Sequence, residues 1–557
     1  QVQLGSFLLR HNFLAEIQKC CSLLSSCAIA IYYRTCHSMR PTPAKCHYTF
    51  NLRDLFKVLQ GLFQANESVI ITKDLAAQLL VHETTRIFHD RLVDAGDREN
   101  FYQYLSEEIL NYFKISWPAG KLMKDPVEFV DFLDLDSAAK SRVYRPVTSH
   151  KQLVSKLDEY RMKMRMSSAI AGDTYVFFME AVQHMTRATR VFRQPGSHMM
   201  MVGLDGTGKS SIAALSCYIS GCKLFRLLVT QGYSHAEFRE DVKKVYKEAG
   251  LRGQSAVLLI RGSDIIQDSF LEDITCILNL GEVPDLFDKD ELDGLLVELK
   301  AEAAEANMSD SPQSLLDFFL QRVRCNLHLV LAVSPAGQSF RQRCRTHPSL
   351  VNCCTIDWYD GWPQEALLSV ADTFITQQDV VHENKVGSVG HIAAVCVAIH
   401  NSVSSKVTQY QEETRRRYYV TPQTYLSFID TFTHILHTKK QKLMEDRDRF
   451  FMGLSKLLEA TSSIGIMQQE LVTLGPQIEW KSEEIEELMV KLQKDSVVVE
   501  QVRAIVQQEE EVMVQETRIV QDYAEQAQKE LSDVLPALEE AVSALDSLDK
   551  ADISEVK

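Results

Sequence analysis

The sequence predicts an α/β fold, in which a parallel five-stranded sheet carries a phosphate loop and a helical lid, with a helical domain before it and a long coiled-coil helix after it. Three observations support this architecture. Five short apolar segments alternate with helix-like segments between residues 197 and 365. A glycine-rich loop follows the first of them. From residue 478 onward an apolar residue recurs at every seventh position, which is the spacing of a coiled-coil seam.

Length and composition indicate a folded protein with several domains. The chain has 557 residues, of which 45% are hydrophobic and 24% charged, which excludes global disorder and a collagen-like class. The net charge of −15 argues against a general nucleic-acid or membrane-surface binder. The 13 cysteines show no zinc-ligand spacing, so we expect reduced thiols and no structural metal. No apolar stretch is long enough to span a bilayer.

The five strand candidates are short and continuously apolar. This pattern is typical of a parallel sheet that is buried on both faces. They are His198–Gly203, Lys223–Val229, Ala256–Ile260, Leu327–Val333 and Cys353–Trp358. Residues 1–115 and 366–436 have helical patterns, and residues 116–196 are expected to hold a linker and the first helices before the sheet. We therefore predict domains at 1–115, 116–196, 197–365, 366–436 and 437–557.

A phosphate loop is predicted directly after the first strand. The segment GLDGTGKSS has the G-x-x-x-x-G-K-[ST] spacing and precedes a helix-like segment. Its glycines let backbone N–H groups converge on phosphate oxygens, and the helix N-terminus adds a favourable dipole. Lys209 is expected to reach the outer phosphates, and Ser210 to hold Mg²⁺. The predicted residues for ATP or ADP are Gly203, Asp205, Gly206, Thr207, Gly208, Lys209, Ser210 and Ser211.

The acidic residues that hydrolysis requires are missing from their usual place. A second buried strand should end in an Asp that supports Mg²⁺, and often in a Glu that activates water. Here Arg261 and Gly262 follow Ile260, and Asp264 lies further along the chain. We therefore predict nucleotide binding with weak or absent hydrolysis and assign no catalytic residue. The alternative is that the strand is aligned differently, so that Asp264 serves.

Residues 437–557 form a distinct acidic segment. Asp and Glu outnumber Lys and Arg there by 26 to 14, and no glycine follows Gly475. The seam positions are Ile478, Ile485, Leu492, Val499, Val506, Met513, Val520, Ala527, Val534, Ala541 and Leu548. A coiled coil also needs a second apolar position in each heptad. Here the residues three or four positions after each seam residue are apolar in some heptads and polar in others. The simple interpretation is an imperfect coil, and the alternative is a coil whose partner helix has two registers of similar energy.

The chain contains no second heptad segment of comparable length. The seam must therefore be covered by another chain or by sequence that this chain lacks, and we expect the chain to be a fragment.

Several long segments resemble one family in its order along the chain. They include TPAKCHYTFNLRDLFKVLQGL, VHETTRIFHDRLVD, AVQHMTRATRVFRQPGSHMMMVGLDGTGKSS and RCNLHLVLAVSPAGQSFRQRCRTHPSLVNCCTIDW. These segments and the acidic coil resemble the dynein heavy chains, which are ring-forming AAA+ motors with a coiled-coil stalk, and the axonemal type in particular. The resemblance implies the helical lid of the third AAA+ module at 1–115, the fourth module at 116–436 and the outgoing stalk helix at 437–557.

The resemblance implies roles for residues near the nucleotide. Arg53 matches a sensor-type position in the third module's lid, and Thr424 stands at the corresponding position of the fourth module. Ser334 matches a sensor-type position after the fourth strand. The fourth module therefore lacks both this arginine and the acids expected at Arg261 and Gly262, which is similar to a regulatory, nucleotide-binding module.

Two further sets of residues follow from the resemblance. Arg345, and after it Arg343, are the candidates for an arginine finger that enters the neighbouring module's site. The segment Val176–Phe178, and Val176 and Phe177 in particular, is expected to pack near the adenine.

The resemblance implies a part of an ATP-driven, minus-end-directed microtubule motor of cilia and flagella. Expected partners are the neighbouring AAA+ modules, the returning stalk helix, and dynein intermediate and light chains, with microtubules bound only through a stalk tip that this chain lacks. The expected location is the cytoskeleton of the axoneme. One alternative is a non-motor scaffold with a degenerate ATPase module and a coiled coil. Another, an ATP-gated chromosome-maintenance protein, would require an LSGG-like signature, which the sequence lacks.

Overall fold

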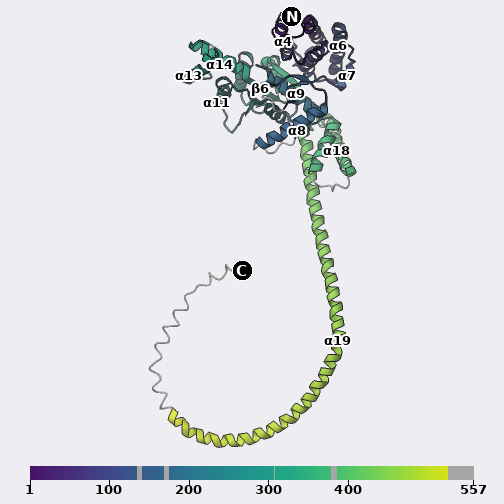
Figure 1. Ribbon diagram of the computed structural model, residues 1–557, viewed down its shortest axis with the longest axis vertical. Coiled ribbons are helices and arrows are strands. Elements are labelled where there is room, and N and C mark those ends of the chain that lie inside the picture. Colours follow the sequence, from purple (N-terminus) through teal and green to yellow (C-terminus); the bar gives the residue numbers. More distant parts are fainter. Residues whose placement is uncertain (135–140, 168–174, 307, 378–385, 525–557) are drawn as a thin grey trace. The chain divides into compact units, whose positions relative to one another are not determined.

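The computed structural model describes residues 1–134, 141–167, 175–306, 308–377 and 386–524. The chain divides into two units, residues 1–439 and residues 440–557, which we describe separately (Figure 1).

The first part of unit 1 is an N-terminal helical domain. Its helices are α1 (Val2–Arg10), α2 (Ala15–Lys19), α3 (Cys21–Ser38), α4 (Leu52–Leu62), α5 (Lys73–Thr84) and α6 (Ala95–Phe113). A π-helical turn, Thr85–His89, continues α5. Asn51 and Asp54 form a capping box at the start of α4, which satisfies two backbone donors that the helix would otherwise leave unpaired.

The core of this helical domain extends beyond residue 115, where we predicted its end. Leu122, Phe129 and Tyr144 are buried in the same apolar cluster as the helices before them. They come from α7 (Ala119–Lys124) and from a short antiparallel ribbon of β1 (Phe129–Val130) and β2 (Arg145–Pro146). This part of the linker is therefore packed onto the helical domain.

The central sheet confirms the predicted α/β fold. Its strands are β3 (His198–Val202), β4 (Lys223–Arg226), β5 (Ala256–Arg261), β6 (Leu327–Val333) and β7 (Cys354–Trp358), and all pairings are parallel, in the order β4-β5-β6-β3-β7. All five strand candidates are confirmed, with ends that shift by up to three residues. Met200 on the inner strand β3 lies between Leu331 on β6 and Ile356 on β7.

Helices cover both faces of the sheet, which explains why its strands are apolar without alternation. One face packs against α8 (His150–Ser167), α9 (Met179–Arg193) and α10 (Lys209–Ser220). The other face packs against α11 (His235–Tyr246), α12 (Asp268–Leu280), α14 (Pro312–Asn326), α15 (Ser339–Thr346) and α16 (Ser349–Cys353). A π-helical turn, Lys247–Leu251, follows α11, and α13 (Lys289–Glu305) packs on α14.

A smaller helical lid follows the sheet. It comprises α17 (Gln364–Gln377), α18 (Val386–Thr414) and the first turns of α19 (Pro422–Ala524). Tyr425 and Ile429 on α19 are buried against Leu367 and Val370 on α17, and the Tyr425 hydroxyl donates to the Leu367 carbonyl at 3.0 Å. These contacts fix the start of α19 beside the phosphate loop.

In unit 2, α19 continues as a single helix to Ala524. Its apolar seam residues are exposed, for example Ile478 at 60% and Leu492 at 64%. The predicted seam positions from Ala527 onward lie outside the described residues. Within the described parts of the chain, no helix combines the length and apolar character needed to cross a membrane.

Candidate nucleotide site

The phosphate loop lies between β3 and α10, as the motif predicts. Gly206 and Gly208 have φ angles of +83° and +88°, a backbone region that side chains with a Cβ rarely adopt. A Cβ on Gly206 would also lie 2.3 Å from the Cβ of Gln423, at the start of α19. The loop therefore turns tightly beneath the lid, at the N-terminus of α10, where backbone N–H groups attract anions.

Lys209 is buried within this loop. Its Nζ donates to the carbonyls of Gly203 and Leu204, each at 2.6 Å. Burial lowers the pKa of Lys209 to about 8, while Asp205 acts weakly in the opposite direction. The ammonium group is thus poorly solvated and placed where a phosphate would provide a strong partner.

A cavity of about 530 Å³, which we call the phosphate-loop cavity, opens between the loop and the lid. The loop contributes Gly206, Thr207 and Gly208. The remaining wall is partly apolar and aromatic, as expected for a base-binding site. Its apolar and aromatic lining includes Tyr175, Val176, Phe178, Met185, Ile212, Trp358, Tyr359, Trp362, Pro363, Val370, Phe374 and Leu426.

One of the two predicted adenine-side residues lines this cavity. Val176 does, but Phe177 does not. Phe177 packs instead with the core beneath α8–α10, and the Arg161 guanidinium lies 5.7 Å from its ring centroid. Phe178 lines the cavity in its place and makes an edge contact with Trp362. The difference between Phe177 and Phe178 has a simple cause, because neighbouring side chains of an extended segment point to opposite sides.

The end of β5 has a cation where an acid would be expected. The Arg261 guanidinium is paired with Asp264, with Nη2 to Oδ1 at 3.1 Å. Asp264 also accepts from the Arg261 backbone N–H at 2.9 Å and from the Ser263 hydroxyl at 3.2 Å. Its side chain is 5% exposed. Both carboxylate oxygens therefore close the turn after β5, which argues against Asp264 as a base.

A second, smaller cavity of about 220 Å³ lies beyond the carboxyl ends of β5 and β6. We call it the strand-end cavity. Its polar lining includes Asp205, Gly262, Ser263, Ser334 and Arg343. Ser334 follows β6 as predicted and accepts from the Ala336 backbone N–H at 3.4 Å.

The three arginines with predicted roles have different positions. Arg343 donates to the carbonyls of Gly262 at 3.4 Å and Ile265 at 3.3 Å, so it contacts its own module. Arg345 is exposed, and no polar partner is found for it among the described residues. The Nη1 of Arg53 lies 2.7 Å from the sulfur of Cys353 in α16. Arg53 is therefore at the junction with the sheet domain.

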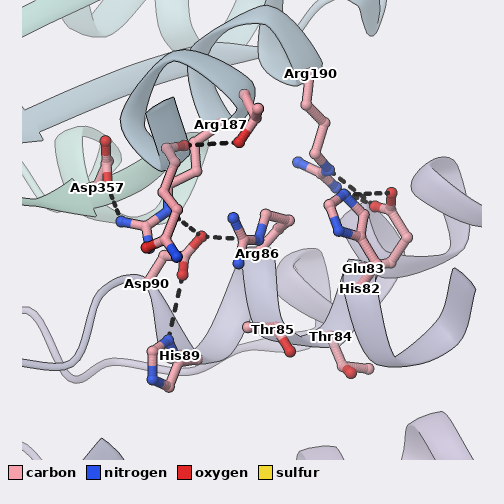
Figure 2. Close-up of polar contacts among 12 residues, drawn as sticks. His82, Glu83, Thr84, Thr85, Arg86, His89, Asp90, Arg187, Arg190 and Asp357 are labelled. Carbon is pink, nitrogen blue, oxygen red and sulfur yellow. Dashed lines mark hydrogen bonds and ion pairs between the residues drawn. The ribbon is translucent and has the colours of Figure 1, made fainter. Parts of the chain in front are cut away.

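A buried ionic network joins the N-terminal helical domain to the sheet domain (Figure 2). Asp90 lies between two guanidinium groups, with Arg187 Nε at 3.0 Å and Arg86 Nε at 3.1 Å from its Oδ2. Arg187 also donates to Asp357 at 2.7 Å, and Asp357 pairs with His184 at 2.8 Å. Burial alone would raise the pKa of Asp90, but Arg187 and Arg86 hold it well below its usual value.

The helical domain also forms part of the phosphate-loop cavity wall. His89, Asp90 and Arg98 line it together with His184 and Arg187 from α9. Arg98 pairs with Asp360 at 2.6 Å. Sequence reasoning did not assign these residues to the site. The segment VHETTRIFHDRLVD was recognised only as part of the family resemblance, and nothing in its local pattern indicates which of its charges are buried.

Comparisons with known protein families agree with this geometry. A family model described as the P-loop containing dynein motor region D4 matches residues 173–435, and an AAA+ lid domain model matches residues 24–116. The chain belongs to the dynein heavy chain family. The first match contains the phosphate loop, the sheet and the helical lid, so residues 173–435 are a dynein motor module.

Axonemal dynein heavy chains are among its relatives. The chain is 38% identical to human dynein axonemal heavy chain 6 over 496 residues, which are 89% of this chain and 12% of that protein. It is 35% identical to mouse dynein axonemal heavy chain 2 over 547 residues, 98% of this chain and 12% of the relative. It is 46% identical to human dynein axonemal heavy chain 14 over 359 residues, 64% of this chain and 10% of the relative. The chain thus spans about an eighth or less of these dyneins.

Proposed function

We propose that this dynein motor module binds ATP or ADP and serves the motor as a regulatory site with little or no hydrolysis. The observation that carries the proposal is the Arg261–Asp264 pair beside an intact phosphate loop. Lys209, Gly206 and Gly208 form a phosphate site next to a base-sized cavity. The acid nearest to the end of β5 is held by Arg261 and Ser263, so no carboxylate there is free to accept a proton from water.

The placement within a dynein ring is part of this proposal. We assign the N-terminal helical domain to the lid of the third AAA+ module and residues 116–436 to the fourth module. The family model for region D4 and the preceding lid match support this order. The neighbouring modules would then be direct partners, and the buried Asp90–Arg187 pair would belong to the junction between two successive modules.

We assign residues 437–557 to the outgoing stalk helix. The exposed apolar seam supports a coiled coil with the returning helix of the same heavy chain. Axonemal relatives support a place in the axoneme of cilia or flagella, as part of a minus-end-directed motor with intermediate and light chains. Microtubule contact would occur through the tip of the stalk.

The competing function is that of a scaffold whose module binds no nucleotide. Loss of the acids at the end of β5 favours it, whereas the buried Lys209 and the positive-φ glycines of the phosphate loop oppose it. Retaining a lysine that loses solvation has an energetic cost, which is offset when a phosphate binds. This argument favours the nucleotide-binding module.

Labelled-ATP binding and phosphate release by the purified chain test the proposal. We expect saturable binding that Lys209→Ala abolishes and Lys300→Ala, on the exposed face of α13, preserves. Phosphate release should stay at background. Absence of binding in the unmodified chain would support the scaffold, and robust Lys209-dependent release would show that another residue activates water.

A further inference from the structure

We infer that nucleotide binding at this module does not require Mg²⁺, because Arg261 stands at the strand end where a metal-dependent site would present a carboxylate. This inference rests on the proposed nucleotide binding and specifies the ligand as metal-free ATP or ADP. It replaces the sequence prediction that Ser210 holds Mg²⁺.

The donor set around the phosphate loop fits Mg²⁺ poorly. Mg²⁺ prefers hard oxygen ligands in octahedral geometry and is usually supported by one or two carboxylates. At the end of β5, the position of the expected acid holds Arg261. The nearest carboxylate, Asp264, is buried and accepts from Arg261 through both oxygens at 3.1 Å. Releasing it for a metal would leave the Arg261 guanidinium without its partner.

Another nearby carboxylate is Asp205 in the phosphate loop. Its side chain is 91% exposed, and its Oδ1 lies 4.0 Å from the Lys209 Nζ. A carboxylate beside this ammonium group is already partly neutralised, and water competes for its oxygens. No group of three or more His, Cys, Asp or Glu side chains arranged to hold a metal occurs in the described parts of the chain.

A cation, in contrast, lines the strand-end cavity. It is Arg343, which lies in the wall together with Asp205 of the phosphate loop and Gly262 at the end of β5. Its hydrogen bonds to the carbonyls of Gly262 and Ile265 are long, at 3.4 Å and 3.3 Å, so its guanidinium is only weakly held. The Arg261 side chain is 56% exposed at the end of the neighbouring strand.

A guanidinium group can replace the charge that Mg²⁺ would supply to the outer phosphates. Arginine binds phosphate oxygens through two parallel N–H donors and keeps its charge at all physiological pH values. Lys209 and Arg343 together would neutralise the terminal phosphate from two sides of the loop. A metal bound in the same place would meet like charges, which lowers its contribution to affinity.

The first test compares affinities of the unmodified chain for labelled ATP and ADP in excess MgCl₂ and in excess EDTA. We expect dissociation constants that agree within about threefold, a difference of less than 1 kcal/mol. Binding that weakens by about tenfold or more in EDTA would overturn the inference while leaving the proposed nucleotide binding intact. Absence of binding in both conditions would overturn both.

A matched pair of variants on α15 tests the role of the guanidinium. Arg343→Gln should weaken binding in EDTA by about tenfold and restore a dependence on Mg²⁺, because one phosphate-directed charge is lost. Arg341→Gln, on the same helix but outside the cavity lining, should change neither the nucleotide affinity in EDTA nor its dependence on Mg²⁺. Thermal unfolding of both variants serves as the folding control. Equal nucleotide affinities of the two variants in EDTA would contradict the assignment of Arg343 as a phosphate-binding residue.

Discussion

Arg187 pairs with Asp90 across the junction between the sheet domain and the N-terminal helical domain, with Nε 3.0 Å from Oδ2. The same guanidinium donates to Asp357 at the end of β7 at 2.7 Å (Figure 2). All three side chains are at least 87% buried. One arginine thus joins the N-terminal helical domain, a strand end and the wall of the phosphate-loop cavity.

Removing Arg187 should destabilise this junction strongly. Arg187→Gln leaves Asp90 and Asp357 buried with one cationic partner fewer, and breaking a buried pair in this way typically costs about 3–5 kcal/mol. We expect a clear decrease in the melting temperature and faster proteolysis between the two domains. Arg165→Gln, at an exposed position on α8, is the matched control. Equal melting temperatures for the two variants would show that the pair contributes little.

A double variant separates the cost of leaving one charge buried alone from the loss of the ion pair itself. Asp90→Asn together with Arg187→Gln removes both charges of the pair. We expect the double variant to lose less stability than the sum of the single variants, because neither charge remains buried alone. Additive losses would mean that the two residues act independently.

Nucleotide affinity should fall at alkaline pH because of Lys209. Burial lowers the pKa of this lysine to about 8, so its charge is lost as the pH rises through this value. A bound phosphate favours the charged form, and the dissociation constant should therefore increase above pH 8, by up to about tenfold for each pH unit. Isothermal titration calorimetry at about pH 7 and pH 9 measures this change.

Lys209→Arg provides the control for the pH dependence. An arginine keeps its charge over this range, so any binding that this variant retains should vary little between the two pH values. A pH dependence that is the same in both proteins would assign the effect to a group other than Lys209.

The sheet could be predicted from the sequence, because its strands are short apolar runs with no competing pattern. The phosphate loop could be predicted for a similar reason, since its glycines and Lys209 are close in sequence. Asp90, Arg187 and Asp357 could not, because they are far apart in the chain and only the fold brings them together. Phe177 was named beside Val176 because apolar character alone does not indicate which side of an extended segment faces a cavity.

The packing of the segment after the N-terminal domain could not be predicted for a related reason. Residues 116–150 lack a clear helical or strand period, and we expected a linker. Phe129 and Tyr144 nevertheless complete the core of the helices. Irregular segments pack through individual side chains, which periodicity does not reveal.

Acid should destabilise the junction through His47. This side chain stacks on Trp358 with ring centroids 4.9 Å apart, and its Nε2 is 3.0 Å from the Arg91 carbonyl, so the neutral ring donates there. Burial lowers the pKa of His47 to about 4. The unfolded chain therefore binds more protons between about pH 6.5 and pH 4, and stability is lost as the pH falls through this range, by roughly 3 kcal/mol at its lower end.

Melting temperatures at about pH 7 and pH 5 measure this effect. His47→Phe keeps an aromatic ring against Trp358 but cannot be protonated, so its melting temperature should fall less with acidification than that of the unmodified chain. Other buried histidines, including His198, whose pKa burial lowers to about 3, contribute equally to both proteins. An identical decrease in both proteins would exclude His47 as a source of acid sensitivity.

Restoring acids at the end of β5 should make nucleotide binding depend on Mg²⁺ and should increase ATP hydrolysis. The double substitution of Arg261→Asp and Gly262→Glu removes the guanidinium and supplies a carboxylate for Mg²⁺ and one for water activation. A Cβ at Gly262 meets its nearest neighbour, the Val333 Cα, at 3.7 Å, which is an ordinary contact. We expect binding that weakens about tenfold in EDTA and phosphate release at least about tenfold above that of the unmodified chain.

The comparison variant combines Arg261→Asp with Gly262→Gln, which retains the metal-supporting acid but has no base. It should acquire the dependence on Mg²⁺ without the increase in phosphate release, because an amide cannot accept the proton from water. The two effects are thereby separated. Release by the glutamine variant that equals release by the glutamate variant would show that position 262 is not where water is activated.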